Sequence, residues 1–258
     1  LSAFQTTLSP ISQWAPPIKP ESLAWVSDGA LVIEHTITVP PREGDRKGQP
    51  LDFSGILLYQ GLEGRGFGYH RDDLWADLVS VVGSGNGHIL LSRYEKKLNF
   101  LAEFDHTTLK DVRRLDSMAE VRRGPAQVVR WLPGPDGRVL TRLVVSLPPS
   151  PAFSIEARAA ESAESPWRVV QSVEGDTPDF QPLGFGADPT RLYGLKVGPG
   201  RRTVVATLDI DTGTISDPVF AAPGVDVDGA VQDLYSDRIV GFRFADNFRR
   251  INWLDDGL

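Results

Sequence analysis

A short hairpin pattern recurs five times along the chain and restricts the possible folds more than any other feature. Each copy has an apolar stretch, a turn rich in Gly, Asp, Ser or Pro, and a second apolar stretch, which is typical of two antiparallel strands. The copies span Leu23 to Ile33, Leu78 to Leu91, Val128 to Thr141, Pro182 to Gly194 and Val231 to Gly241. The apolar residues that follow the five turns, Leu31, Ile89, Val139, Leu192 and Ile239, are 58, 50, 53 and 47 residues apart, with a mean of 52.

Further strand-like stretches lie between the hairpins and bring each unit to three or four strands. They cover Gly55 to Tyr59, Leu98 to Phe104, Phe153 to Ala159, Trp167 to Val173 and Thr203 to Ile210. Four antiparallel strands repeated at this spacing are the pattern of a β-propeller blade. We therefore expect an all-β fold, a β-propeller of about five blade-length units of three to four antiparallel strands. A large β-sandwich with coincidental turn spacing is the alternative.

One segment has some helical character, and one turn is especially clear. Ile155 to Glu164 is the best helix candidate, but alternating polarity before it and the flanking Pro151 and Pro166 favour strand and loop. The segment Leu208 to Thr214, sequence LDIDTGT, ends a strand with an Asp that can accept hydrogen bonds from its own backbone and a Gly that tolerates positive φ. Both features support strands that reverse direction.

The two ends of the chain differ from the repeats. Residues 1–22 contain four prolines and are predicted to form an N-terminal arm or linker, with the propeller over residues 23–258. The fifth unit has only Arg250 to Leu254 as a third strand, so its blade is unfinished. Either the arm completes that blade and closes the ring, or the chain is part of a larger ring. The chain starts at Leu1 and has Met118 as its one methionine, which leads us to expect a processed or shortened chain.

Composition excludes several classes of protein. The 25 Gly and 20 Pro are spread along the chain, so they mark turns and not low complexity. A net charge of −7 opposes nucleic-acid binding, and the four Arg-Arg pairs form no stripe interleaved with aromatic residues. No apolar run reaches the length of about 18 residues that a membrane helix needs, so we expect no membrane partner. With no cysteine there are no disulfides or thiolate ligands, and bacterial periplasm and cytoplasm both remain open as compartments.

No catalytic, cofactor-binding or metal-binding residue can be nominated, and the substrate-binding residues are unknown. Ser84 lacks the complete Gly-x-Ser-x-Gly elbow of an α/β-hydrolase and is interpreted as part of a hairpin turn. The four histidines, at 35, 70, 88 and 106, have no zinc-ligand spacing. The glycine-rich stretch from Gly61 to Gly68 lacks a phosphate-loop pattern and is expected to be a loop.

Acidic residues give no site either. Asp226, Asp228 and Asp233 lack the remaining acidic residues of a calcium loop. The adjacent pairs Asp72-Asp73 and Asp255-Asp256 would point to different sides of a strand, so neither is an acid/base pair. We therefore expect no cofactor.

Large apolar residues recur at one position of the repeat. Trp25 and Trp131 both end the first strand of their hairpins, where Phe185 and Leu234 stand in two other copies. This equivalence predicts packing between neighbouring blades, with Trp25 and Trp131 buried. Stacking of a ligand on these tryptophans is the alternative.

The second half of the chain resembles a known family. Its motifs are WLPGPDG at 131–137, PWRVV at 166–170, PLGFGADPTRLY at 182–193, TLDIDTG at 207–213, DVD at 226–228, RIVGFRF at 238–244 and INWLD at 251–255. In this order they are similar to the N-terminal propeller of bacterial prolyl oligopeptidase family serine peptidases of the dipeptidyl aminopeptidase and acylaminoacyl peptidase type. The resemblance covers Val128 to Leu254, about half of the chain, and Leu23 to Thr36 fits more loosely.

The resemblance implies a non-catalytic propeller that caps the active site of a C-terminal α/β-hydrolase domain and restricts the access of peptides. That partner domain, with its Ser, Asp and His triad, has no counterpart in these residues, so whether this chain itself is an enzyme is uncertain. A stand-alone propeller that binds a protein or small ligand on its loop face is the second hypothesis, with Pro40 to Gln49 and Gly61 to Asp73 as binding loops. A glycoside hydrolase with its site in the central channel is a third, and it lacks a carboxylate pair.

Overall fold

The computed structural model describes residues 18–27, 29–39, 51–60, 68–71, 76–82, 87–95, 98–108, 110–117, 126–146, 151–159, 165–175, 178–233 and 235–254. These residues form five separate antiparallel sheets, each a simple meander in which sequential strands are neighbours. In the described ranges the one helical element is the short 3-10 turn η3 (Pro199–Arg201), and no helix there is long and apolar enough to cross a membrane. The all-β expectation is confirmed.

The five sheets are called blades 1 to 5 in chain order. Blade 1 contains β1 (Ile18–Ser27), β2 (Ala30–Val39), β3 (Leu51–Gln60) and β4 (Gly68–Arg71). Blade 2 contains β5 (Ala76–Ser80), β6 (His88–Glu95), β7 (Leu98–Asp105) and β8 (Lys110–Ser117), and blade 3 contains β9 (Ala126–Pro133), β10 (Val139–Ser146), β11 (Ala152–Ala157) and β12 (Arg168–Glu174). Blade 4 contains β13 (Phe180–Phe185), β14 (Arg191–Val197) and β15 (Thr203–Asp209), and blade 5 contains β16 (Val227–Gln232), β17 (Ile239–Ala245) and β18 (Arg249–Trp253).

All five predicted hairpins form, and each is the first hairpin of its blade. Every one of these first strand pairs contains a register shift, which increases the local twist of the sheet. The predicted turn after β15 also forms, because the Asp209 carboxylate accepts hydrogen bonds from the backbone N–H groups of Asp211 and Thr212. Gly213 adopts a φ of 74° there. The stretch Ile155 to Glu164, which was considered as a helix and rejected, begins with the last three residues of β11, and its residues 160–164 lie outside the described part of the chain.

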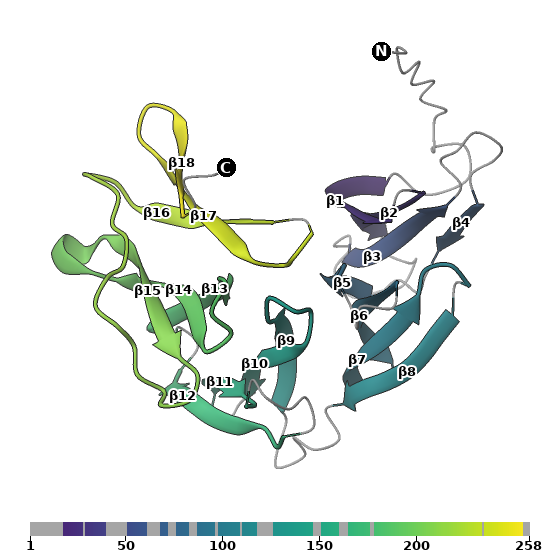
Figure 1. Cartoon of the computed structure of the whole chain (residues 1–258), viewed down its shortest axis with the longest axis horizontal. Helices are drawn as coiled ribbons and strands as arrows, with labels where there is room; N and C mark the ends of the chain where they lie inside the picture. Colours follow the sequence, from purple (N-terminus) through teal and green to yellow (C-terminus); the bar gives the residue numbers. More distant parts are fainter. Residues whose placement is uncertain are drawn as a thin grey trace, which may run out of the picture.

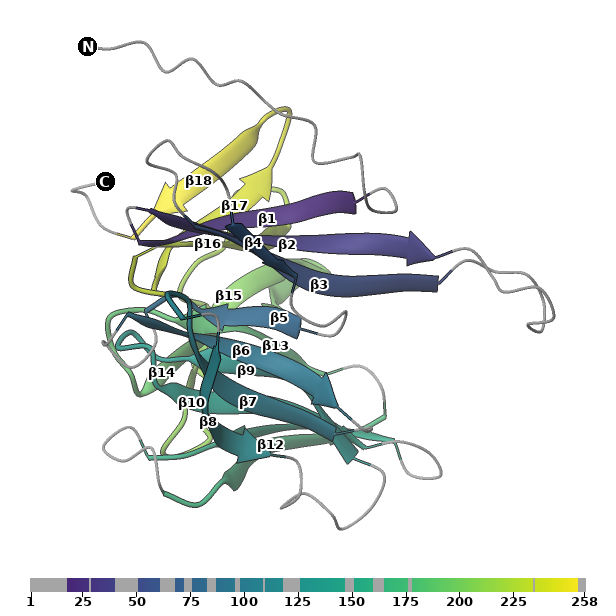
Figure 2. The ribbon, with the colours of Figure 1, turned by 90° about the vertical axis from the view of Figure 1, so that its right-hand side faces the viewer.

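The blades follow one another around a common centre in an open arc (Figure 1). Seen from the side, the strands of successive blades form a stack of twisted sheets (Figure 2). Blade 5 and blade 1 are the two ends of this arc and belong to separate sheets with no strand pairing between them in the described ranges. The fold is thus an open β-propeller. Among the described residues its last strand is β18, the third strand of blade 5.

Four hydrophobic clusters lie between consecutive blades and hold the arc together. Blades 1 and 2 share one that includes Val32, Ile56 and Phe104, and blades 2 and 3 share one that includes Leu90 and Trp131. The cluster between blades 3 and 4 is the largest, with Leu140, Phe185 and Leu208 among its fully buried members. Blades 4 and 5 are joined through Val205, Val227 and Phe242. Burial of both faces of each inner blade is the packing that a propeller requires.

The structure corrects the prediction for Trp25. Trp131 is buried, with 4 % of its surface exposed, whereas Trp25 is 47 % exposed. Trp131 and Phe185 each pack against the blade that precedes their own. Trp25 stands at the same repeat position in blade 1, and within the described ranges no other blade precedes this one to cover it. Leu234 lies outside the described residues.

The boundary of the predicted arm also differs from the structure. β1 begins at Ile18, so residues 18–22 of the predicted 1–22 arm pair with β2 and belong to blade 1. They therefore add no strand to blade 5. Residues 1–17 lie outside the described part of the chain. The fifth blade has three strands, as predicted for an unfinished unit, and blade 4 has three as well.

Candidate functional site

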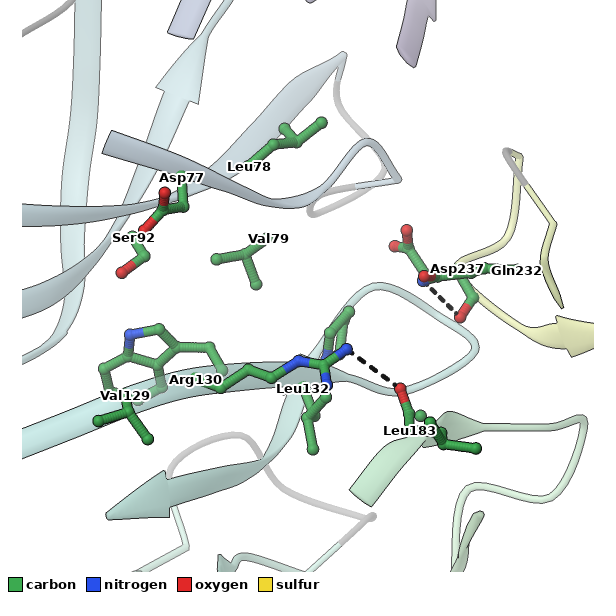
Figure 3. Close-up of a pocket in the computed structure, with 13 residues that line it drawn as sticks. Asp77, Leu78, Val79, Ser92, Val129, Arg130, Leu132, Leu183, Gln232 and Asp237 are labelled. Atoms are coloured by element: carbon green, nitrogen blue, oxygen red, sulfur yellow. Dashed lines mark hydrogen bonds between the residues drawn. The ribbon is translucent and has the colours of Figure 1, made fainter. Parts of the chain in front are cut away.

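A cavity of about 260 Å³ lies at the centre of the arc and is the candidate functional site. The first strands of four blades contribute to its wall, with Leu78 and Val79 from β5, Arg130 from β9, Leu183 from β13 and Gln232 from β16. Figure 3 shows these side chains around the open space, with β5 on one side and β9 on the other. The first strands of blades 2 to 5 therefore share one central cavity.

Arg130 provides the cationic group of the cavity. Its side chain runs across the cavity toward Leu183 (Figure 3), and its Nη1 and Nη2 groups donate to the carbonyls of Pro182 and Leu183 at 3.2 and 3.3 Å. Both acceptors are backbone atoms of β13, so Arg130 links blade 3 to blade 4. Burial among the surrounding blades lowers the pKa of Arg130, although water still reaches the side chain. Uncompensated desolvation of this kind disfavours the charged form.

Asp237 enters the cavity from the turn between β16 and β17. It is a non-glycine residue with a φ of 53°, a conformation that Asp tolerates better than most side chains, and its carbonyl accepts a hydrogen bond from Gln232 Nε2 at 2.9 Å. Its carboxylate accepts a hydrogen bond from the Ser80 hydroxyl at the end of β5. Burial raises the pKa of Asp237 to about 6, although the hydrogen bonds from Ser80 and from the Val81 and Val82 backbone act in the opposite direction.

A second acidic group, Asp77, lies on β5 at the other end of the cavity (Figure 3). Burial raises its pKa, a hydrogen bond from Ser54 opposes this shift, and the charge of Glu34 adds to it. Glu34 also connects blade 1 to this wall, because its carboxylate accepts a hydrogen bond from the Leu78 N–H at 2.9 Å. The two acidic groups of the cavity therefore have partners from blades 1 and 2, away from Arg130.

The wall behind Arg130 is built from a polar cluster that the repeat pattern does not reveal. Asn99 on β7 accepts hydrogen bonds from Ser92 Oγ at 3.0 Å and from Trp131 Nε1 at 3.1 Å, and it donates to the Val128 carbonyl at 3.2 Å. These contacts fix the position of β9 against blade 2. Next to Arg130, a second hollow of about 450 Å³ opens between blades 3 and 4 and is lined by residues such as Phe153 and Gln181.

The histidines of the sequence lie at separate positions in the structure. His35 is buried in β2 and His106 is buried just after β7. His88 Nδ1 lies 2.7 Å from Glu103 Oε1, and Arg113 Nε donates to the other oxygen of Glu103 at 2.7 Å. The His70 side chain is outside the described part of the structure. In the ranges that the structure describes, His, Asp and Glu side chains nowhere gather in threes as a metal site.

The other sequence candidates are likewise not brought together. The Asp226 carboxylate accepts a hydrogen bond from the Thr203 N–H, and Asp233 accepts one from Ser236 within its own turn. The Asp228 Oδ1 atom lies 3.8 Å from Arg243 Nε. Ser84, residues 61–67, the pair Asp72-Asp73 and the pair Asp255-Asp256 lie outside the described residues.

Arg130 and Asp237 were missed in the sequence for different reasons. Arg130 had a usable signal, since it is a charged residue in the first strand of a predicted hairpin. Asp237 had none, because an Asp in a turn between strands is ordinary.

Comparisons with solved structures find matches of low similarity. TolB from Acinetobacter baumannii has 16% sequence identity and a TM-score of 0.40, and a putative dipeptidyl aminopeptidase IV from Bacteroides ovatus ATCC 8483 has 13% and 0.41. The matches cover 80% and 91% of this chain but only 45% and 38% of those two chains. A functionally unknown protein from Desulfotomaculum acetoxidans DSM 771 has 14% identity and a TM-score of 0.37, with 93% of this chain and 90% of that chain covered.

No protein-family model matches the chain, and the search of curated proteins finds no match. At these identities and TM-scores the structural likenesses carry no functional assignment. The propeller arrangement itself rests on the five meanders, the four clusters between consecutive blades and the shared cavity of four first strands.

Proposed function

We propose that this chain is the non-catalytic propeller part of a serine peptidase of the prolyl oligopeptidase type. In this proposal the propeller caps a separate α/β-hydrolase domain and restricts which peptides reach its active site through the central channel. The ordered motifs between Val128 and Leu254 support the family, and the channel supports the role. A passage surrounded by rigid strands admits narrow, extended chains and rejects folded ones, because close-packed sheets do not widen at low cost.

The single observation that carries the proposed role is the small size of the central cavity. Four first strands surround a cavity of about 260 Å³, and Arg130 and Asp237 reach into it from blades 3 and 5. This volume is just below the range of about 300 to 1,000 Å³ that is usual for small-molecule sites. A peptide segment a few side chains wide is therefore the largest object that fits without movement of the blades.

The gating role is tested by narrowing the channel in the complete protein that the gene encodes. Val79 lines the cavity, so Val79→Trp should lower kcat/KM for peptides of eight or more residues much more than for a dipeptide chromogenic substrate. Val197→Trp is the matched control, because Val197 is 71% exposed and does not line the cavity. If the ratio of kcat/KM for long peptides to kcat/KM for the dipeptide substrate is the same in both variants, gating through the central cavity is contradicted.

The second hypothesis, a stand-alone binding propeller, is separated from the first by the gene and by labelling. An in-frame segment with Gly-x-Ser-x-Gly beyond codon 258 supports the peptidase, and a stop codon near codon 258 supports the binding module. The purified 258-residue chain should leave aminoacyl and peptidyl chromogenic substrates intact and should not react with a fluorophosphonate probe, since hydrolysis requires a nucleophile, a base and an oxyanion hole in mutual contact. Stoichiometric serine labelling would contradict the non-catalytic assignment in either case.

A further inference from the structure

Arg130, which is exposed to water, differs from three other arginines in having no acidic partner among the residues that the structure describes. Arg142 pairs with Glu156, Arg158 with Asp116 and Arg113 with Glu103. The partners of Arg130 in the described ranges are the carbonyls of Pro182 and Leu183, and its pKa responds to burial alone. In the described part of the chain, this cation of the central cavity therefore forms no ion pair, although Asp77 and Asp237 line the same cavity.

The guanidinium has spare hydrogen-bonding capacity toward the cavity. An arginine carries five N–H donors in a planar fork, and two of them are used in the bonds to Pro182 and Leu183. Those bonds are 3.2 and 3.3 Å long, at the long end of the usual N–H···O range and just beyond it, so they hold the group in place weakly. The remaining donors match the two oxygens of a carboxylate, which arginine binds in a bidentate manner.

The surroundings of Arg130 fit a small anion with an apolar part. Val79, Leu132 and Leu183 line the cavity near it and supply apolar surface. The acidic Asp237 is held by Ser80, and Asp77 has its hydrogen bond from Ser54, so both carboxyl groups have partners on blades 1 and 2.

We propose that Arg130 is the anchor of a carboxylate-binding subsite in the central cavity, which holds the C-terminal carboxylate of a short peptide. The identity of the occupant as a peptide rests on the proposed function, whereas the carboxylate preference rests on the unpaired guanidinium and the apolar wall. Anchoring one end of a peptide in this cavity would select short peptides with a free C-terminus.

The test uses the purified 258-residue chain and two matched ligands, N-acetyl-Ala-Ala and its C-terminal amide. The acetyl group removes the ammonium charge, so the pair differs only in the carboxylate. In isothermal titration calorimetry we expect the acid to bind at least tenfold more tightly than the amide. Equal binding of the two ligands, or no binding of the acid, would overturn the proposal. Tighter binding of inorganic phosphate than of the acid would replace the carboxylate assignment with a phosphate site and also overturn it.

Variants then locate the site. Arg130→Gln should weaken binding of the acid at least tenfold and leave binding of the amide unchanged. Arg191→Gln is the control, because Arg191 lies on β14, has a 64% exposed side chain and pairs with Asp188 at 3.5 Å. An Arg130→Gln protein with unaltered affinity for the acid would place the anion elsewhere.

Failure of this subsite leaves the proposed function standing, since gating is measured as hydrolysis by the complete protein. If the gating test fails but the acid still binds more tightly than the amide, the protein is a propeller that binds carboxylates without gating a peptidase.

Discussion

The Ser80 hydroxyl of blade 2 donates a hydrogen bond to the Asp237 carboxylate of blade 5, joining two residues 157 positions apart in the sequence. Because Asp237 lies in the turn between β16 and β17, the contact ties the last blade to the second one across the centre of the propeller. Asp237 is buried, and the N–H groups of Val81 and Val82 also donate to it. The open arc is therefore closed at its centre by a turn even though its outer ends do not pair.

The first prediction is a pH dependence of stability through Asp237. Its pKa is raised from 3.8 to about 6 in the folded protein, so the folded state binds a proton more tightly than the unfolded state. Between about pH 4 and pH 6 the free energy of unfolding should therefore fall as pH rises, by a total of about 3 kcal/mol if the whole shift contributes. Above about pH 6 the loss of unfolding free energy caused by ionised Asp237 no longer changes with pH.

Asp237→Asn removes the ionisation and keeps a side chain that tolerates positive φ and can accept the Ser80 hydrogen bond. The variant should be more stable than the unchanged protein at pH 7, and its urea-unfolding free energy should change less between pH 4 and pH 7. Asp217→Asn is the control, because Asp217 is exposed. A variant with the same pH profile as the unchanged protein would show that Asp237 does not carry this dependence.

The second prediction separates two tryptophans at the same repeat position. Trp131→Ala should lower the free energy of unfolding by about 3 to 5 kcal/mol, because it removes a buried ring that donates to Asn99. Trp25→Ala should cost less than about 1 kcal/mol, since Trp25 is 47 % exposed on an uncovered blade. Chemical denaturation of both variants measures the difference. Similar large losses would mean that another blade or chain covers Trp25 in solution.

The third prediction concerns a charged cluster between blades 2 and 3. Asp116 on β8 accepts hydrogen bonds from Arg158 and from Trp167 Nε1, the latter at 2.6 Å. The guanidinium carbons of Arg142 and Arg158 lie 4.4 and 3.8 Å from the centre of the Trp167 ring. Asp116 is therefore the charge partner of Arg158 in a site with two buried cations and an aromatic ring, where Arg142 pairs with Glu156.

Asp116→Ala should destabilise the protein by about 3 to 5 kcal/mol, because it leaves a buried guanidinium without its charge partner. Asp111→Ala is the matched control. Asp111 pairs with Arg93 at 2.5 Å but is 48% exposed, so its loss should cost less than about 1 kcal/mol. Thermal denaturation followed by circular dichroism compares the two. Equal costs would show that the cluster contributes no more than a surface ion pair.

The fourth prediction is self-association through the last blade. Among the described residues β18 pairs with β17 alone, so one of its edges is unpaired, and Ile251 and Trp253 are 40% and 44% exposed on it. Exposed strand edges with apolar side chains are templates for pairing with another chain. Sedimentation velocity should show association that grows with protein concentration.

Ile251→Lys should reduce this association, because a charge on an edge strand opposes pairing. Val219→Lys is the control, since Val219 is 51% exposed but lies outside the strands of blade 5. A protein that stays monomeric at all concentrations would indicate that the edge is covered, and would favour the stand-alone propeller hypothesis.

The sequence by itself determined the blades. Apolar residues that alternate with a period of two indicate strands, and residues such as Gly and Asp indicate turns. Both signals are local, so the five hairpins, the turn from Leu208 to Thr214 and the strand at Phe153 could be predicted from neighbours in the chain. The strands β4 and β8 were not foreseen, because Gly68–Arg71 is short and Lys110–Ser117 is mostly charged or polar.

Only the tertiary structure decided what each blade packs against and what meets at the centre. Trp25 and Trp131 are equivalent in the repeat, yet one is exposed and the other buried, because burial depends on whether a preceding blade is present. The contact between Ser80 and Asp237, and the unpaired charge of Arg130, depend on how the blades are placed around the centre. No local pattern encodes such contacts, since they join residues whose positions are set by the packing of whole sheets.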